Sequence, residues 1–75
     1  MMIVEVTDVS GDTIWVNLDQ MCTFKIETNL EMAKRYGYSV LGFTYGIHKL
    51  NEISTKNIER ILERQLEYLP YGRTK

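Results

Sequence analysis

The chain has few of the residues from which small proteins build disulfides, metal sites and catalytic dyads. Its 75 residues include one cysteine, Cys22, and one histidine, His48. A single cysteine cannot form an intramolecular disulfide, so this common support of small secreted domains is excluded and a reducing, cytoplasmic setting is favoured. A zinc site needs several cysteine, histidine or carboxylate ligands. The sequence therefore predicts no metal, and no feature of it indicates a cofactor.

Long apolar runs, phosphate-binding glycine motifs and a strong net charge are also missing. No stretch approaches the roughly 20 apolar residues of a membrane span, and Glu5 interrupts the amino end where a signal peptide would be apolar. None of the five glycines belongs to a nucleotide-binding fingerprint. The formal net charge is −1, whereas duplex nucleic acid is usually bound by a clearly basic face. We therefore expect no membrane association, and the acidic balance argues against nucleic acid as the main partner.

What is present is the composition of one ordinary globular domain. Hydrophobic residues make up 44% of the chain and charged residues 25%, as in folded proteins and unlike disordered ones. The length leaves room for a single hydrophobic core. We expect one domain over residues 1–75, with strands within residues 2–50, a helix over residues 55–69 and a short tail over residues 70–75.

Alternating apolar and polar residues predict antiparallel strands in the first part of the chain. Met2, Val4 and Val6 share one face of a first strand, and Gly11 lies in the turn that follows. The apolar positions expected to face the core from the next two strands are Ile14, Val16, Leu18, Cys22, Phe24 and Ile26. In this arrangement the Cys22 thiol is an inert core group, with no motif that pairs it with His48 as a nucleophile.

The middle of the chain predicts a loop followed by a second hairpin. Residues 28–37 contain helix-forming residues but are too short for an independent helix, so we interpret them as a loop with at most one helical turn. Residues 38–45 and 47–50 have strand composition on either side of Gly46. The predicted fold is α+β: a small antiparallel sheet of about five strands, as a meander or partly closed barrel, packed by one carboxyl-terminal helix.

The carboxyl-terminal segment is the clearest helix in the sequence. Ser54 is a suitable N-cap, and Ile53 and Ile58 stand at the spacing of a hydrophobic staple. Pro70 ends the helix, because the residue before a proline is disfavoured in the α conformation. The apolar stripe that we expect to dock on the sheet consists of Ile58, Ile61, Leu62, Leu66 and Leu69.

The polar side of this helix carries charges of like sign four residues apart. Each row repels itself, and only Arg60 with Glu63 and Arg64 with Glu67 attract each other at i,i+3 spacing. The simpler interpretation is a solvated face with these pairs, and the alternative is a docking surface for a partner. The residues of this possible partner surface are Lys56, Glu59, Arg60, Glu63, Arg64 and Glu67.

Trp15 is the residue that most strongly indicates a contact surface. If its neighbours in the second strand face the core, Trp15 faces outward on the same side as Ile3. A large ring in water often marks an interface, although the loop over residues 28–37 could instead cover it. Alternation in the fourth strand indicates a second apolar surface. The predicted interface therefore consists of Ile3, Trp15, Leu41, Phe43 and Tyr45.

Several short features together resemble a known group of proteins. They are the turn glycines Gly11 and Gly46, the segment Val16-Asn17-Leu18-Asp19, and the helix start Glu52-Ile53-Ser54. The pattern resembles the small flagellar FlbD-like proteins and related short proteins of bacteria and their phages. It covers most of the chain except residues 28–37 and the tail after Leu69. The resemblance implies a compact β-sheet with a packed helix, no enzymatic activity, and a regulatory or assembly role through partner proteins.

Two functional hypotheses follow for this chain. The favoured one is a non-enzymatic regulatory or assembly protein that acts by protein–protein interaction, self-associates as a homodimer or higher oligomer, and binds a further protein partner. The alternative is a nucleic-acid-binding module that stacks bases on Trp15, Phe43 or Tyr45. Its phosphate contacts would come from Lys56, Arg60, Arg64, Arg73 and Lys75. An enzyme is the third class, and it would need Cys22 or His48 as its reactive group.

Overall fold

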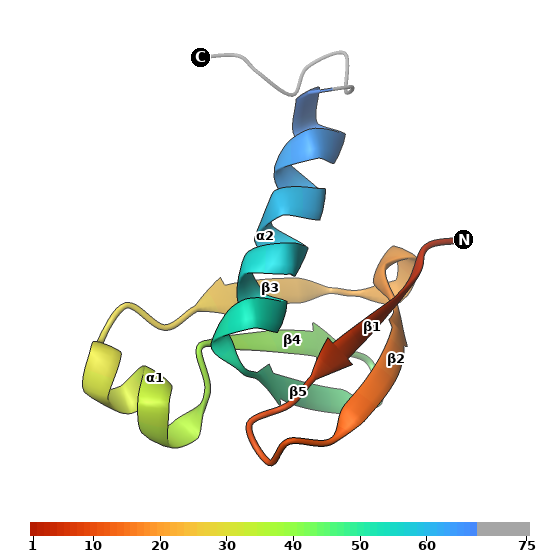
Figure 1. Cartoon of the computed structure of the whole chain (residues 1–75). Helices are drawn as coiled ribbons and strands as arrows, with labels where there is room; N and C mark the ends of the chain where they lie inside the picture. Colours follow the sequence, from red (N-terminus) through yellow and green to blue (C-terminus); the bar gives the residue numbers. More distant parts are fainter. Residues whose placement is uncertain (68–75) are drawn as a thin grey trace.

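The structure is a computed structural model that describes residues 1–67, without the side chains of Leu66 and Glu67. It confirms the α+β class. The elements in chain order are β1 (Ile3–Thr7), β2 (Thr13–Asn17), the 3-10 helix η1 (Leu18–Gln20), β3 (Thr23–Ile26), α1 (Leu30–Tyr36), β4 (Ser39–Phe43), β5 (Gly46–Leu50) and α2 (Glu52–Glu67) (Figure 1). The predicted helix end at Pro70 and the stripe residue Leu69 lie outside the described residues. Within the described part of the chain, no helix is long and apolar enough to cross a membrane.

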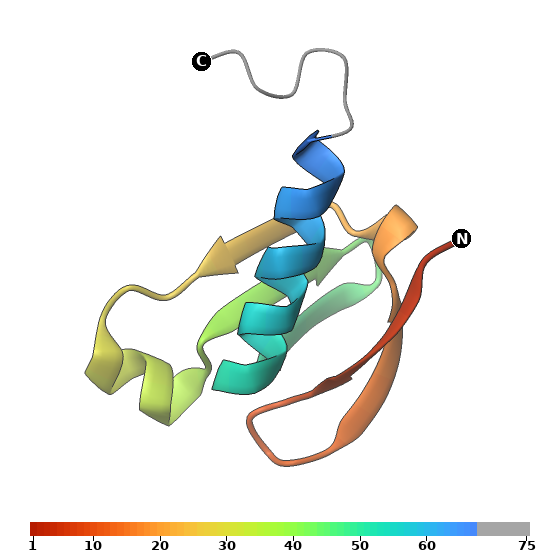
Figure 2. The same cartoon turned by 45° about the horizontal axis from the view of Figure 1, so that its top comes forward.

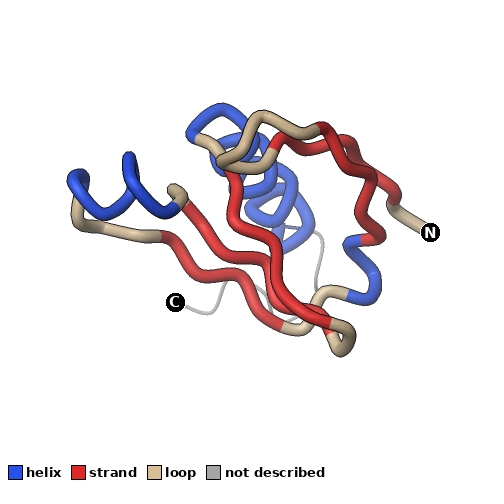
Figure 3. The backbone as a smooth tube through the Cα atoms, turned by 90° about the horizontal axis from the view of Figure 1, so that it is seen from below, coloured by secondary structure: helices blue, strands red, loops and turns tan. Residues whose placement is uncertain are grey.

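The strands form two antiparallel sheets and not one. β1 pairs with β2, while β4 lies between β3 and β5. The two sheets meet where Asp8 bridges Leu50 and the Val9 N–H donates to the Lys49 carbonyl at 3.0 Å. From this corner they splay apart, with α2 seen end-on between them (Figure 3). The predicted single sheet is wrong, because η1 turns the chain between β2 and β3 and these two strands do not pair in the described structure.

The hydrophobic core lies between the inner faces of the two sheets and α2. The alternation predicted for the first two strands is confirmed, since their inner residues are buried in this core or packed against it. Ile58 of α2 is fully buried, and Ile61 and Leu62 pack against the core, which confirms the docked helix. The Leu66 side chain lies outside the described residues. The buried core residues are Val6, Val16, Leu18, Leu41, Phe43, Leu50 and Ile58.

The start of α2 differs from the prediction. Asn51 and not Ser54 caps the helix, because the Asn51 side-chain oxygen accepts the Ser54 N–H at 2.9 Å. The Ser54 hydroxyl is buried and accepts the Thr7 N–H of β1 at 2.8 Å. Ile53 is 71% exposed, so the predicted staple with Ile58 is wrong as well. Ser54 therefore fastens α2 to the hairpin.

The segment predicted as a loop contains the helix α1. At the start of α1 the Asn29 side-chain oxygen accepts the Met32 N–H at 3.1 Å, and Ala33 is the buried residue of this helix. Gly37 ends α1 with φ of +128°, a conformation that favours glycine. A Cβ at Gly37 would also lie 3.0 Å from the Cβ of Lys49. Both the backbone conformation and the lack of space therefore favour glycine at this position.

The third strand is an edge strand and is less buried than predicted. In the described part of the chain β3 pairs only with β4, and Phe24 is half-buried against the core. Ile26 is 39% exposed, and Cys22 is exposed just before the strand begins. The prediction of Cys22 as a core thiol is therefore wrong, because the core ends before it reaches this edge.

Candidate interaction surfaces

The outer face of the β1–β2 hairpin carries the most exposed aromatic ring of the predicted interface. The register pairs Ile3 with Asn17 and Glu5 with Trp15, so the side chains of Ile3 and Trp15 project from the same face. Trp15 is 68% exposed and Ile3 46%. The alternative in which residues 28–37 cover the indole is therefore wrong. Because Trp15 lies within a paired strand, its backbone is held in a fixed position.

The second apolar surface predicted in the fourth strand does not exist. Leu41 is fully buried and Phe43 is 8% exposed, because both side chains face the core and α2. The alternating pattern correctly predicted that Leu41 and Phe43 share one face of β4. The prediction that this face is exposed is wrong. Tyr45, the third residue of this set, is 66% exposed in the turn between β4 and β5.

Tyr45 belongs to an aromatic cluster with Phe43 and His48. The Tyr45 ring stacks on Phe43 with centroids 5.1 Å apart, and the His48 ring meets both rings edge-on. The Tyr45 hydroxyl lies 3.0 Å from His48 Nε2, while the Cys22 thiol contacts the Gln20 carbonyl at 3.8 Å. Cys22 and His48 thus have different polar partners. Across residues 1–67 no group of three or more histidine, cysteine or acidic side chains is placed to hold a metal ion.

The ion pair on the described part of α2 is not the one that its sequence spacing predicts. Lys56 Nζ lies 3.8 Å from a Glu52 carboxylate oxygen. Arg60 donates to the side-chain oxygen of Asn57 at 3.1 Å, and among the described side chains it forms no ion pair with Glu63. The predicted pair of Arg60 with Glu63 is therefore wrong. The pair of Arg64 with Glu67 lies outside the described side chains.

A groove of about 640 Å³ lies between β1 and α2, which diverge from each other in Figures 1 and 2. Sequence reasoning missed this groove, because it depends on how α2 is placed relative to the hairpin. Two of its residues, Arg60 and Arg64, were nevertheless in the predicted partner surface. The lining residues are Met2, Val4, Glu5, Asn57, Ile58, Arg60, Ile61, Arg64 and Gln65.

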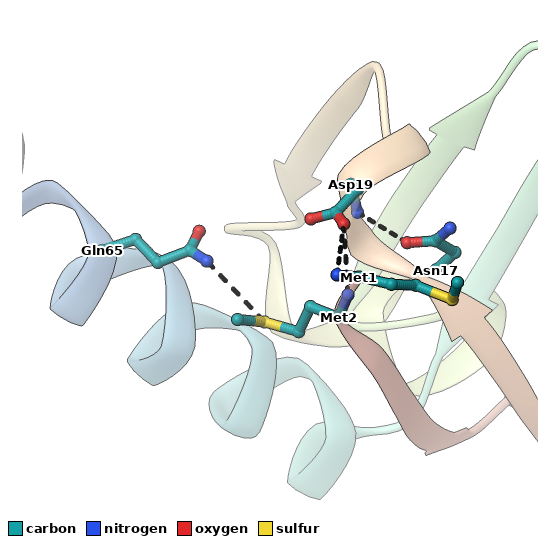
Figure 4. Close-up of polar contacts among 5 residues, drawn as sticks. All are labelled: Met1, Met2, Asn17, Asp19 and Gln65. Atoms are coloured by element: carbon teal, nitrogen blue, oxygen red, sulfur yellow. Dashed lines mark hydrogen bonds and ion pairs between the residues drawn. The ribbon is translucent and has the colours of Figure 1, made fainter.

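Polar contacts fix the amino end of β1 beside this groove. The Met2 N–H donates to an Asp19 carboxylate oxygen at 3.2 Å, and the Met1 ammonium lies 3.4 Å from the same carboxylate (Figure 4). Asp19 is itself positioned by its N–H, which donates to the Asn17 side chain at 3.0 Å. Across the groove, the Gln65 amide donates to the Met2 sulfur at 3.7 Å. This end of the groove is therefore bridged.

The nucleic-acid alternative loses one of its stacking residues. Phe43 is buried, and Trp15 has Glu5 opposite it in the register. Arg73 and Lys75 lie outside the described residues. Nucleic-acid binding therefore stays a prediction that the geometry does not favour.

No family model, no curated protein and no solved structure matches this chain. The resemblance to FlbD-like proteins stays a prediction. The exposed face of the hairpin and the groove beside it are the features of this chain that indicate a function.

Proposed function

We propose that this chain is a non-enzymatic protein-interaction module, with a regulatory or assembly role, that self-associates through the outer face of the β1–β2 hairpin. The observation that carries this proposal is the 68% exposure of Trp15 within a regular strand. An indole ring offers a large apolar contact area together with one hydrogen-bond donor, and tryptophan is enriched among the residues that dominate binding energies.

The surroundings of Trp15 suit a small symmetric interface. Ile3 adds a second apolar side chain on the same face, and Glu5, Thr13 and Asn17 supply a polar rim. A two-fold axis through this face would place Trp15 and Ile3 against the same residues of a second copy, which is the self-complementary arrangement of homodimers. A domain of this size also has little stability in reserve, and association is a common way to increase it.

Sedimentation velocity over a concentration series tests the proposal. We expect the sedimentation coefficient of the wild-type chain to rise with concentration, and that of Trp15→Glu to stay at the monomer value, because a buried unpaired carboxylate disfavours the interface. Tyr36→Glu is the matched control, since Tyr36 is a 49% exposed aromatic residue on α1. It should associate like the wild type. A wild-type chain that stays monomeric throughout, or a Trp15→Glu chain that associates normally, contradicts the proposal.

A further inference from the structure

Within residues 1–67, β1 has an unpaired edge that borders the groove. The Thr7 N–H donates to the Ser54 hydroxyl, and the Thr7 carbonyl accepts the Asn51 N–H at 3.0 Å, so both groups point away from β2. Backbone groups of alternate residues in an antiparallel strand point the same way, so those of Ile3 and Glu5 also point away from β2. No hydrogen bond joins these groups to β5 or to the described side chains of α2. Such an edge is a template for another strand.

The groove has the length of a short strand and is bounded at both ends. The Ser54 to Thr7 bond bounds one end, and the Gln65 to Met2 contact bounds the other. β1 spans about 17 Å between these points at roughly 3.3 Å per residue, and α2 spans about 16 Å at 1.5 Å per residue. The two walls therefore match in length. The volume of about 640 Å³ falls within the usual range of ligand pockets.

The groove combines an apolar lining with two basic side chains and one acidic side chain, Glu5, so its basic groups outnumber its acidic one. Val4, Ile58 and Ile61 contribute the apolar part, and Arg60 and Arg64 lie one turn apart on α2. The Arg60 guanidinium is oriented by its bond to the Asn57 side chain at 3.1 Å. Guanidinium groups pair well with carboxylates. This lining complements a segment in which apolar and acidic side chains alternate.

We propose that the groove binds an extended segment of a partner protein, with alternating apolar and acidic residues, which adds as a strand to the β1 edge. Main-chain bonds to Ile3 and Glu5 would supply affinity, and the side-chain pattern would supply specificity, as in other cases of strand addition. The site differs from the outer face that carries Trp15. The proposal therefore does not depend on self-association.

Two other occupants fit the groove less well. The chain's own residues 68–75 contain no acid and carry Arg73 and Lys75, so they do not complement the arginines of the groove. A second copy related by a two-fold axis would bring its own β1 edge, which α2 borders in every copy. A single extended segment from a partner has neither difficulty.

Fluorescence anisotropy with a labelled peptide of alternating valine and glutamate tests the side-chain pattern. We expect the wild-type chain to bind this peptide and not its counterpart with lysine in place of glutamate. Arg60→Glu with Arg64→Glu should weaken binding by about tenfold or more, because two attractive charge pairs become repulsive. Arg35→Glu is the matched control, since Arg35 is exposed on α1, and it should bind normally. Absence of binding, or equal binding of the lysine peptide, overturns the proposal.

Amide hydrogen exchange measured by NMR tests the strand addition itself. We expect the Ile3 and Glu5 amides to exchange quickly in the dilute free chain and at least about tenfold more slowly with the valine and glutamate peptide bound. The Val4 and Val6 amides, which face β2, should be protected in both states. Binding without protection at Ile3 and Glu5 overturns strand addition. Protection of the Ile3 and Glu5 amides in the dilute free chain would indicate that residues 68–75 occupy the β1 edge, which contradicts the proposal. Protection that grows with protein concentration in the absence of peptide would indicate that a second copy occupies the edge, which also contradicts it.

Discussion

The β1–β2 hairpin and the β3–β4–β5 sheet follow the same alternating pattern but differ in how they use their outer faces. The outer face of the three-stranded sheet carries Thr23, Lys25 and Lys49 as well as the exposed Ile47. The outer face of the hairpin carries the largest exposed ring of any strand, Trp15. The sheet face mixes polar and aliphatic side chains, whereas the hairpin face presents a large aromatic ring, and for this reason we propose the hairpin face as the contact surface.

The two regions also differ in how they are stabilised. β4 is paired on both sides, and four of its five residues are buried. The hairpin has only two strands, and an isolated two-stranded hairpin is at best marginally stable in water. It depends on its inner apolar face and on the corner where Asp8 bridges Leu50 and Ser54 bonds Thr7. Stability is therefore concentrated in the sheet and α2, and the free edge and exposed ring are concentrated in the hairpin.

Truncating a side chain at the centre of the three-stranded sheet should destabilise the protein more than truncating the exposed ring of the hairpin. Leu41→Ala removes a fully buried side chain and should lower the free energy of unfolding by about 2–5 kcal/mol. Trp15→Ala should change it by about 0.5 kcal/mol or less in dilute monomer, because the ring is mostly in water. Urea unfolding followed by circular dichroism measures both. A dilute Trp15→Ala chain that loses as much stability as Leu41→Ala would contradict the division between the two regions.

A smaller effect is expected from cutting the link between the hairpin and α2. Ser54→Ala leaves the Thr7 N–H without its acceptor, which should lower the free energy of unfolding by about 1–3 kcal/mol. Ser10→Ala is the matched control, because Ser10 is exposed in the hairpin turn and only its backbone N–H donates to Asp8. Equal stability of the two variants in urea titrations would show that this bond does not fasten the hairpin.

Sequence patterns predicted the faces of the first two strands and the anchor of α2 correctly, because these depend on local alternation and helical spacing. The position of Trp15 followed from the same alternation. The capping residues Asn29 and Gly37 also carried the signal for α1, which short length alone had argued against. These features are local, and a local pattern is enough to find them.

The remaining features depend on contacts between distant segments. Alternation alone does not say which face of β4 meets the core, so Leu41 and Phe43 were placed on the surface. Asn51 and Ser54 are equally good caps in sequence, and only the position of Thr7 decides that the Ser54 hydroxyl turns to β1. The groove between β1 and α2 requires the relative placement of two elements that no short pattern encodes.

Quenching of tryptophan fluorescence by iodide shows whether the outer face of the hairpin becomes buried on self-association, because Trp15 is the only tryptophan and its fluorescence reports on one site. We expect the quencher to reach Trp15 readily at low protein concentration, and to reach it less as concentration rises and the hairpin faces meet. The emission maximum should shift to shorter wavelength over the same range. Quenching and emission that stay the same across the whole range would contradict the assignment of this face as the interface.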